Sequence, residues 1–280
     1  MRRKSRNARK GLDGLVKALS SLAALTGIVF LVWIICEVLI RGAQAFNWSF
    51  FTALPAPPGT ERGGVAGAIL GTVGIIALAS VIGIPVGIFG GTYLSEFGGN
   101  RFGGVVRFAG NVMMGVPSIV IGLFAYGVIV LTLGHFSGYA GAVALAIIML
   151  PVIARTTEDM LALVPNALRE SALALGSPRW KATAAVLFRA AKSGLITGVL
   201  LAVARVSGET APLLFTALNS SFWPRDLNQP TANLTVTIFN YAMSPYQDWQ
   251  RIAWGASLLI MAAVLALNVF TRVVLRERKR

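Results

Sequence analysis

The stretch that decides the fold of this chain is 155–212, which reads RTTEDMLALVPNALRESALALGSPRWKATAAVLFRAAKSGLITGVLLAVARVSGETAP. It begins with charged residues at the tail of one apolar segment and passes through a hydrophilic turn at 166–178. It then enters a second apolar segment that carries Arg205 and Glu209. Charged residues in or beside two apolar segments predict a membrane protein that has placed its chemistry in this stretch.

Composition places the whole chain in the membrane class. Hydrophobic residues make up 55% and charged residues 13% of the 280 residues, and the mean hydropathy is +0.71. Soluble domains contain about 25% charged residues. The net charge of +14 comes from basic clusters between apolar runs, which is typical of membrane proteins rather than of nucleic-acid-binding domains. Cys36 is the only cysteine, which excludes a disulfide framework and a cysteine metal cluster.

Six segments have the length and composition of membrane-crossing helices, which need about 20 mostly apolar residues. They are 19–40, 66–92, 108–133, 139–158 (extendable to 164), 193–218 and 252–275. The sequence therefore predicts an all-α, polytopic membrane helical bundle with six transmembrane helices. A basic N-terminus, 1–18, precedes the bundle and a basic C-terminus, 276–280, follows it. The first helix is expected to stay uncleaved because its apolar core is longer than that of a signal peptide.

The distribution of lysine and arginine predicts the orientation of these helices. The two ends and the loops at 92–107 and 165–192 contain 19 such residues, against four in the alternate loops. Because positive residues collect on the cytoplasmic side, both termini are expected in the cytoplasm. The segment at about 219–251 then lies outside. Its apolar part, 234–243, is too short to span, and both a docking surface for an external partner and a lid on the helix ends fit it.

Glycines and prolines predict where helices touch and where they break. Gly83, Gly87 and Gly91 recur at four-residue spacing, which allows close approach of helix backbones in lipid. Pro117 lies inside the third predicted span, in the run Gly-Val-Pro-Ser at 115–118. A broken helix that lines a pathway and a simple kink both fit this run.

The hydrophilic turn predicts an elbow of two short helices. Asn166 is the expected N-cap of a helix over 167–175, and Gly176 is its expected left-handed stop. Ser177 is the expected cap of a second helix that starts at Pro178. On the first of these helices Leu168, Ala172 and Leu175 recur at the spacing of one helix face, which suits docking into a groove on a partner. A helix that rests on the membrane surface is the alternative.

Two sets of residues carry a resemblance to a known family. Glu170-Ser-Ala, followed after three residues by Gly176, resembles the Glu-Ala-Ala…Gly cytoplasmic loop of bacterial ABC importer permeases. That loop continues with Ile-x-Leu-Pro in the family, where this chain has Val-Leu-Phe-Arg at 186–189. A narrower resemblance, to the permease of the phosphate-specific ABC importer, extends from about residue 65 to the last span. It is carried by ARVSGETAPLL at 204–214, QPTANLTVTIF at 229–239 and AMSP at 242–245.

The resemblance implies an ABC importer type I permease-like domain over 19–275, with a cytoplasmic coupling loop at about 159–192. It implies the membrane-spanning permease subunit of an ATP-driven importer for inorganic phosphate, in the bacterial inner (plasma) membrane. The implied partners are a homologous sister permease, a pair of ATP-binding subunits and an external phosphate-binding protein. The residues implied to couple to the ATPase are Leu168, Arg169, Glu170, Ala172, Leu175 and Gly176.

Catalysis is not expected of this chain. It has no Gly-Lys-Ser/Thr phosphate loop, so ATP hydrolysis is expected on a partner subunit. His135 is the sole histidine and has no cluster of cysteines or carboxylates near it in sequence, so a hydrogen-bonded loop histidine is expected rather than a metal ligand. No cofactor is expected.

The charges near the apolar segments form two expected pairs. Arg205 and Glu209 are four residues apart, and Arg155 and Glu158 are three apart, so each pair is expected on one helix face. Two ion pairs that fix helix packing would explain these residues. A polar path is the other interpretation, because a guanidinium offers an oxyanion a planar fork of donors. The expected path residues are Arg155, Thr156, Glu158, Arg205, Ser207, Glu209 and Thr210.

Two rival functions fit part of this sequence. A stand-alone, ion-coupled anion carrier or channel would use Arg205 and Glu209 as a charge relay and would leave the elbow a structural loop. An ABC permease for another oxyanion fits equally well, because arginines alone do not separate phosphate from sulfate. Co-purification of an ATPase decides the first question, and comparison of phosphate with sulfate uptake decides the second.

Overall fold

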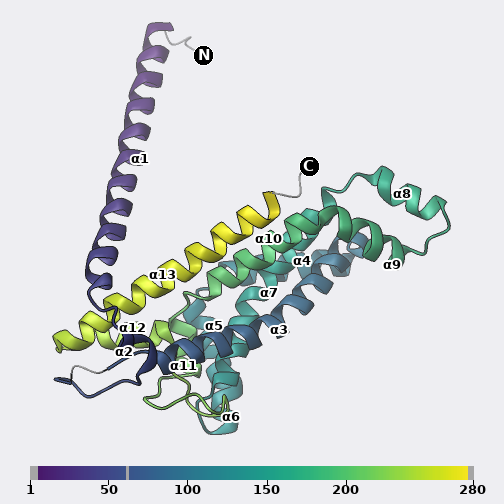
Figure 1. The fold of residues 1–280 in the computed structure, drawn as a ribbon. Helices are drawn as coiled ribbons and strands as arrows, with labels where there is room; N and C mark the ends of the chain where they lie inside the picture. Colours follow the sequence, from purple (N-terminus) through teal and green to yellow (C-terminus); the bar gives the residue numbers. More distant parts are fainter. Residues whose placement is uncertain (1–5, 61–62, 277–280) are drawn as a thin grey trace.

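The structure, a computed structural model, describes residues 6–60 and 63–276, and this part of the chain is built from helices joined by loops (Figure 1). No strand occurs within these ranges. The long elements are α1 (Arg6–Ala43), α3 (Ala66–Phe97), α4 (Arg101–Gly115), α7 (Gly138–Ala162), α10 (Phe188–Val206) and α13 (Gln247–Arg276). The short ones are α2 (Trp48–Thr52), α5 (Ser118–Ala125), η1 (Tyr126–Val130), α6 (Leu131–Leu133), α8 (Asn166–Ala174), α9 (Arg179–Ala182), η2 (Thr183–Leu187), α11 (Ala211–Thr216) and α12 (Leu234–Ala242).

The all-α membrane bundle predicted from the sequence is confirmed. Among the described residues five helices are long and apolar enough to cross a membrane, and a bent pair makes six if it counts as one span. The fourth predicted span takes its longer form, since α7 runs to Ala162. Arg155 and Glu158 therefore lie inside a helix and not at its end.

The third predicted span, 108–133, is wrong as a single helix. α4 ends at Gly115 and the next helical stretch begins at Ser118, with a bend of 104° between them. Val116 has extended dihedrals (φ −72°, ψ 130°), as expected for a residue that precedes a proline. Pro117 also lacks the N–H that a continuing helix would need. The run at 115–118 is thus a break and not a simple kink.

The fifth predicted span, 193–218, is also wrong in its bounds. The helix starts earlier, at Arg179, and it ends at Val206, so that Arg205 lies in its last turn instead of at its middle. Residues 207–210 connect it to α11, which has Pro212 in its first turn. In a continuous helix the ring of Pro212 would collide with the carbonyl group of Gly208. Arg205 and Glu209 therefore do not share a helix face.

The core is centred on α3 and α7, which the glycines of α3 bring together. Gly83, Gly87 and Gly91 are all buried against α7, as their spacing predicts. A methyl group at Gly87 would lie 2.7 Å from Cβ of Ile153, and one at Gly91 would collide with the Ala154 carbonyl group. α10 joins the same core through Ala202 and Val206.

Gly87→Ala is expected to destabilise the protein, because the added methyl group enters a fully packed contact between two core helices. We expect a loss of about 1–3 kcal/mol, measured as a lower midpoint of thermal unfolding in detergent. Gly90→Ala is the matched control on the same helix, since its methyl group would lie 3.8 Å from Cβ of Ala154. Equal effects of the two substitutions would contradict the close contact.

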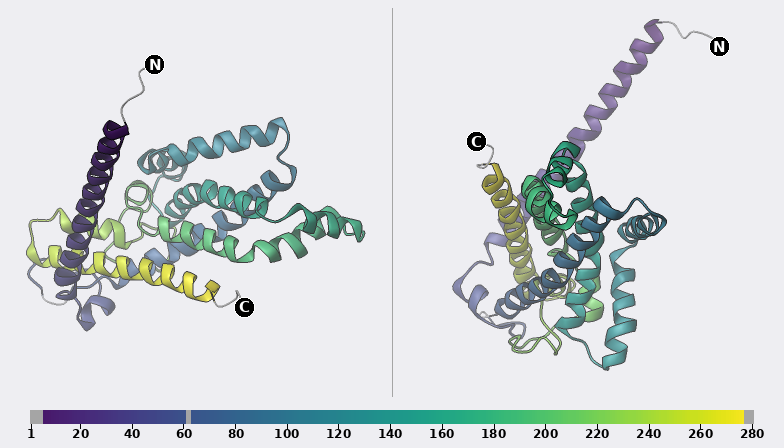
Figure 2. Two further views of the ribbon diagram at one scale, coloured as in Figure 1. Left: turned by 90° about the horizontal axis from the view of Figure 1, so that it is seen from above. Right: turned by 90° about the vertical axis from the view of Figure 1, so that its right-hand side faces the viewer.

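The first helix stands apart from the body. α1 leaves the bundle at a steep angle, and two further views show the same separation (Figure 2). None of the most apolar part of Leu12–Ala43 is buried within this chain. Its last turn packs on α13, where Gly42 lies against Leu258 and the Trp254 carbonyl group.

The segment between α11 and α13 folds over the helix ends. α12 is a short helix with Leu234, Val236 and Tyr241 buried, and it packs on α13 and α3. Fully buried Asn233 caps it: Asn233 Oδ1 accepts a hydrogen bond from the Val236 N–H at 2.9 Å. Of the two predicted alternatives, α12 has the packing of a lid.

Candidate functional site

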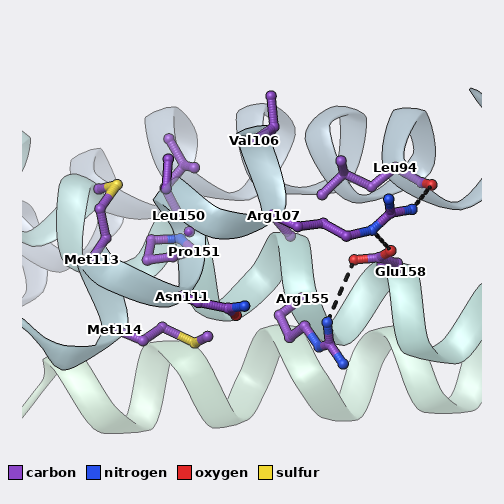
Figure 3. Close-up of a pocket in the computed structure, with 13 residues that line it drawn as sticks. Leu94, Val106, Arg107, Asn111, Met113, Met114, Leu150, Pro151, Arg155 and Glu158 are labelled. Atoms are coloured by element: carbon purple, nitrogen blue, oxygen red, sulfur yellow. Dashed lines mark hydrogen bonds and ion pairs between the residues drawn. The ribbon is translucent and has the colours of Figure 1, made fainter. Parts of the chain in front are cut away.

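The charged residues of α7 meet a partner that the sequence analysis missed. Arg107 of α4 donates from Nε to Glu158 Oε1 at 2.5 Å (Figure 3). Its Nη1 donates to the carbonyl oxygen of Gly98, just beyond the end of α3, at 2.7 Å. Its Nη2 donates to the carbonyl oxygen of Leu94, in the last turn of α3, also at 2.7 Å. One guanidinium therefore joins α4, α7 and the end of α3.

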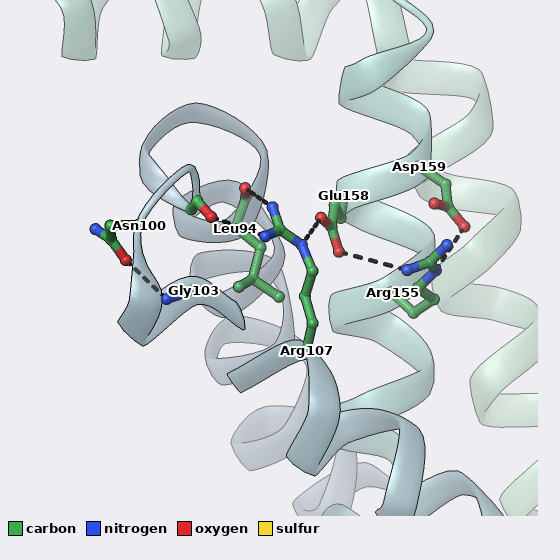
Figure 4. Close-up of polar contacts among 8 residues, drawn as sticks. Leu94, Asn100, Gly103, Arg107, Arg155, Glu158 and Asp159 are labelled. Atoms are coloured by element: carbon green, nitrogen blue, oxygen red, sulfur yellow. Dashed lines mark hydrogen bonds and ion pairs between the residues drawn. The ribbon is translucent and has the colours of Figure 1, made fainter. Parts of the chain in front are cut away.

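Local folding aims Arg107 at these acceptors. α3 ends at Phe97, and Asn100 caps α4 by accepting a hydrogen bond from the Gly103 N–H at 2.7 Å (Figure 4). The chain thus reverses its direction within a few residues. Arg107 lies about two turns into α4, and its side chain therefore reaches the end of α3. Because the last carbonyl groups of a helix have no partners within it, a cation there is stabilising.

Arg155 is the second cation beside Glu158 and is held more loosely. Its Nη1 lies 3.9 Å from Glu158 Oε2, and its Nε donates to Asp159 Oδ2 at 3.2 Å. The predicted Arg155–Glu158 ion pair therefore exists, but Arg107 makes the shorter contact with Glu158. Glu158 Oε2 is buried and accepts no hydrogen bond from the described residues. The Arg155 side chain is 48% exposed and has donors to spare.

Arg107, Arg155 and Glu158 form the polar end of a cavity. The cavity has a volume of about 140 Å³ and lies between α4 and α7 (Figure 3). Its other walls are mainly apolar and include Met113, Met114 and Pro151. An anion that entered here would find Arg155 more available than Arg107, since each of the three nitrogens of Arg107 already donates to a carboxylate or a carbonyl group.

Arg107→Gln is expected to destabilise the fold. It would leave Glu158 with Arg155 alone and would remove both hydrogen bonds at the end of α3. Breaking a buried pair by removing one partner costs about 3–5 kcal/mol, and the lower value applies because one third of the Arg107 side chain is exposed. The measurement is thermal unfolding in detergent beside Arg101→Gln, an exposed arginine of the same helix with no partner among the described residues. If both variants unfold alike, Arg107 is not holding these helices together.

Arg205 and Glu209 are not joined, which corrects the prediction of a second ion pair. The Arg205 side chain is exposed and Glu209 is partly buried in the break after α10. Neither side chain has an ion pair or hydrogen bond within the described ranges, whereas the Glu209 carbonyl oxygen accepts one from Thr235 Oγ1 at 2.8 Å. Arg205 thus presents an unneutralised guanidinium on the surface of this chain.

The predicted hydroxyl donors are largely occupied. Thr156 Oγ1 donates to the Val152 carbonyl group at 2.8 Å, and Ser207 Oγ donates to that of Val203 at 2.7 Å. Thr210 is partly buried just before α11. A helix interior offers its hydroxyl groups the carbonyl group four residues earlier, so the first two hydroxyl groups have no free proton for an anion.

Helix register gives the spacing of the two arginines. Thr156 packs against Gly198 and Met160 against Gly194, so α7 and α10 run antiparallel with a fixed register. Arg205 then falls at the level of Met149. This level is six residues, or about 9 Å along the axis, from Arg155. The two arginines therefore lie at different levels along the axes of α7 and α10.

The elbow forms largely as predicted. α8 ends in a left-handed glycine, since Gly176 has φ 79°. The Gly176 N–H donates to the Leu173 carbonyl group at 2.9 Å and the Ser177 N–H to that of Ala172 at 3.2 Å, the Schellman pattern of bonds. Asn166 is not the N-cap. It is the first residue of the helix, and its Oδ1 accepts a hydrogen bond from Arg169 Nη1 at 2.7 Å.

The second elbow helix begins one residue later than predicted. Pro178 precedes α9 as its N-cap residue, and no side-chain hydrogen bond caps this helix. The cap predicted for Ser177 is therefore wrong.

The predicted coupling residues divide into two groups. Leu168, Glu170, Leu175 and Gly176 are exposed, with 86% of Leu175 accessible. Ala172 is covered because α8 packs on α9 and η2, and Arg169 turns inward to Glu96 of α3. Trp180, 70% exposed, adds to the apolar surface of the elbow and was missed. An exposed tryptophan beside a predicted docking helix is the signal that would have found it.

His135 is a hydrogen-bonded loop histidine, as expected. Its Nδ1 lies 3.0 Å from the Leu133 carbonyl oxygen and its Nε2 lies 3.4 Å from Asn228 Oδ1. The contact with the Leu133 carbonyl group raises the pKa of His135 above its ordinary value. Nothing in these contacts links it to the arginines.

Comparison with known proteins finds a family whose model matches most of this chain. Residues 83–277 match the family described as binding-protein-dependent transport system inner membrane component. The phosphate transport system permease protein PstA of Yersinia pestis is 46% identical over 99% of this chain and 95% of its own length. The protein of the same name from Haemophilus influenzae is 46% identical over 97% and 96%. A probable phosphate transport system permease protein PstA from Methanocaldococcus jannaschii is 37% identical over 78% of each chain.

Solved structures share the fold. A bacterial ABC transporter involved in the import of the acidic polysaccharide alginate superposes with a TM-score of 0.69 over 99% of this chain and 100% of its own, at 12% identity. An inward-facing form of the MetNI methionine ABC transporter gives a TM-score of 0.63 over 76% and 95%, at 17% identity.

Proposed function

This chain belongs to the binding-protein-dependent transport system inner membrane components and, among them, to the phosphate transport system permeases; we propose that it forms a phosphate path together with a sister permease, driven by ATPase subunits. It is a multi-pass inner-membrane protein and a translocation subunit, and ATP hydrolysis belongs to a separate subunit. The partners and the residues of the path are the proposed parts.

The exposed surface of the elbow is the observation that most directly supports the proposal. It projects beyond the ends of α3, α4 and α7 (Figure 1) and exposes Leu168, Leu175 and Trp180. Exposed apolar side chains on a projecting helix are typical of a surface that docks into a partner's groove. A stand-alone carrier has no need of such a surface. The proposed occupant is the ATPase, on the cytoplasmic side, where both termini would also lie.

Arg205 supports a path between two permeases. Although Arg205 lies in the last turn of its own helix, it is level with Met149, near the middle of α7. An arginine at the centre of a span costs about 2.5–3.5 kcal/mol on insertion scales, so Arg205 is not expected to face lipid. Its exposed surface is therefore proposed to face a polar path that a sister permease completes. Arg155 would form a second step, while Thr156, Ser207, Glu209 and Thr210 would line the wall around the two arginines and Glu158 would hold Arg155 in place.

α1 supports the same assembly. An apolar helix that is unburied within its own chain needs lipid or another protein along its length. A permease pair would supply part of that cover, and the lid that α12 forms over the helix ends would face an external phosphate-binding protein.

Co-purification tests this proposal. The tagged chain, solubilised from the membranes of the cells in which it naturally occurs, is expected to bring down an ATP-binding subunit and a second permease. Recovery of an active phosphate carrier without either partner would favour the stand-alone carrier instead.

A further inference from the structure

The elbow helix α8 is tied to the transmembrane body through Arg169. Its Nη2 and Nε donate to Oε1 and Oε2 of Glu96, in the last turn of α3, at 2.8 and 3.2 Å. A guanidinium that binds both oxygens of a carboxylate fixes the orientation as well as the distance of its partner. Arg169 Nη1 also donates to Asn166 Oδ1, so the first turn of α8 is held by the same side chain.

This ion pair is shielded from solvent. The Glu96 side chain is 11% exposed and that of Arg169 is 24% exposed. Pairs at such sites are screened by salt much less than surface pairs are. The rest of α8 packs on its own elbow neighbours, α9 and η2. The contact with Glu96 therefore links α8 to α3, and a 3.5 Å hydrogen bond from Arg169 Nη2 to the Leu161 carbonyl oxygen links α8 to α7 as well.

The end of α3 is held a second time, from the other side. The carbonyl groups of Leu94 and Gly98, which flank Glu96 in sequence, accept the two hydrogen bonds from Arg107. Arg107 in turn binds Glu158, whose second oxygen faces Arg155. A displacement of α8 must then either break the bidentate contact or move the segment 94–98, to which Arg107 is attached.

We propose that Glu96 and Arg169 are positioning residues that couple the elbow to the segment 94–98 and, through Arg107, to Glu158 at the polar end of the cavity. The inference rests on the proposed function, since it describes how motion of a docked ATPase would reach the path. It also changes the role of Arg169, which acts through Glu96 and not by touching the ATPase.

The test uses the whole complex, with sister permease, ATPase subunits and phosphate-binding protein, in proteoliposomes. The measurement is phosphate moved per ATP hydrolysed. Glu96→Gln and Arg169→Lys are each expected to lower this ratio about fivefold or more, the lower end of coupling between two sites. Lysine keeps the positive charge but lacks the planar pair of N–H donors that binds both carboxylate oxygens. Arg169→Lys therefore tests the bidentate geometry, and it remains informative if Glu96→Gln fails to assemble.

Rescue and controls separate coupling from simple destabilisation. The double variant Glu96→Arg with Arg169→Glu restores the pair in reverse and is expected to recover part of the lost ratio. Arg101→Gln, exposed at the start of α4, and Glu37→Gln, which breaks the partly exposed pair with Arg41, are expected to leave the ratio at its wild-type value. Amide hydrogen exchange over 166–174 is expected to rise in the single variants at positions 96 and 169 and not in these controls.

Two results would overturn the inference. One is a wild-type ratio in both single variants, even if hydrogen exchange in the elbow rises, since the pair would then be structural only. The other is a charge-swapped double variant whose ratio is no higher than the product of the effects of Glu96→Arg alone and Arg169→Glu alone, which are measured beside it. If the wild-type complex itself moves no phosphate with ATP, the proposed function fails, which is a different outcome.

Discussion

Arg205→Gln is expected to lower phosphate uptake by about one to two orders of magnitude while the protein still assembles. The Arg205 side chain is exposed and unpaired within the described chain, so its removal breaks no contact that holds the fold. A glutamine is shorter and keeps hydrogen-bonding capacity, but it loses the charge that would draw an anion into an apolar span. Removing a charged hydrogen bond to the substrate costs about 1.5–3 kcal/mol, or one to two orders of magnitude in uptake.

Uptake of labelled phosphate and recovery of the assembled complex are measured on the same membranes. Arg101→Gln is the matched control, an exposed arginine at the start of α4 whose side chain has no partner in the described ranges. It is expected to leave uptake intact. Loss of assembly with Arg205→Gln would show instead that this residue fixes helix packing, the alternative that the sequence left open.

Gly176→Pro is expected to uncouple the elbow from its partner. Gly176 has φ 79°, a region closed to proline, and its N–H donates to the Leu173 carbonyl group. Proline removes that donor and forces the end of α8 to unwind, so that Leu175 and Trp180 leave their present arrangement. Recovery of the ATPase with the tagged permease is expected to fall about tenfold or more, which corresponds to about 1.4 kcal/mol of docking energy.

Gly176→Asn separates loss of geometry from loss of a glycine. Asparagine tolerates the left-handed conformation and keeps the N–H, so it is expected to retain most of the ATPase. If both variants bind the ATPase as the wild type does, the end of α8 is not part of the docking surface.

Hydropathy predicted the bundle because lipid imposes one condition on every span: its backbone must be satisfied internally. The same measure, averaged over about 20 residues, could not see where a span breaks, since the short runs at 115–118 and 207–210 are outweighed by the apolar residues on either side. Pro117 did mark the first break. The second was predictable from Pro212, which excludes a helix that continues from Gly208.

The charged contacts were harder to predict, because they depend on which helices become neighbours. Glu158 has Arg155 three residues away in sequence, yet its shortest contact is with Arg107, 51 residues earlier, because α4 lies beside α7. Likewise the family resemblance that assigned Arg169 to the contact with the ATPase carried no information about Glu96, 73 residues away. Periodicity assigns a residue to a face, and only the tertiary packing assigns its partner.

ATP-driven phosphate uptake by the reconstituted complex tests the central claim most directly. Proteoliposomes that contain this chain, its sister permease and the ATPase subunits are supplied with phosphate-binding protein and labelled phosphate. We expect labelled phosphate to accumulate only when ATP is supplied on the side of the membrane where the ATPase subunits lie. Excess sulfate is expected not to reduce this accumulation. Accumulation that persists without the ATPase subunits, or equal transport of sulfate, would contradict the account.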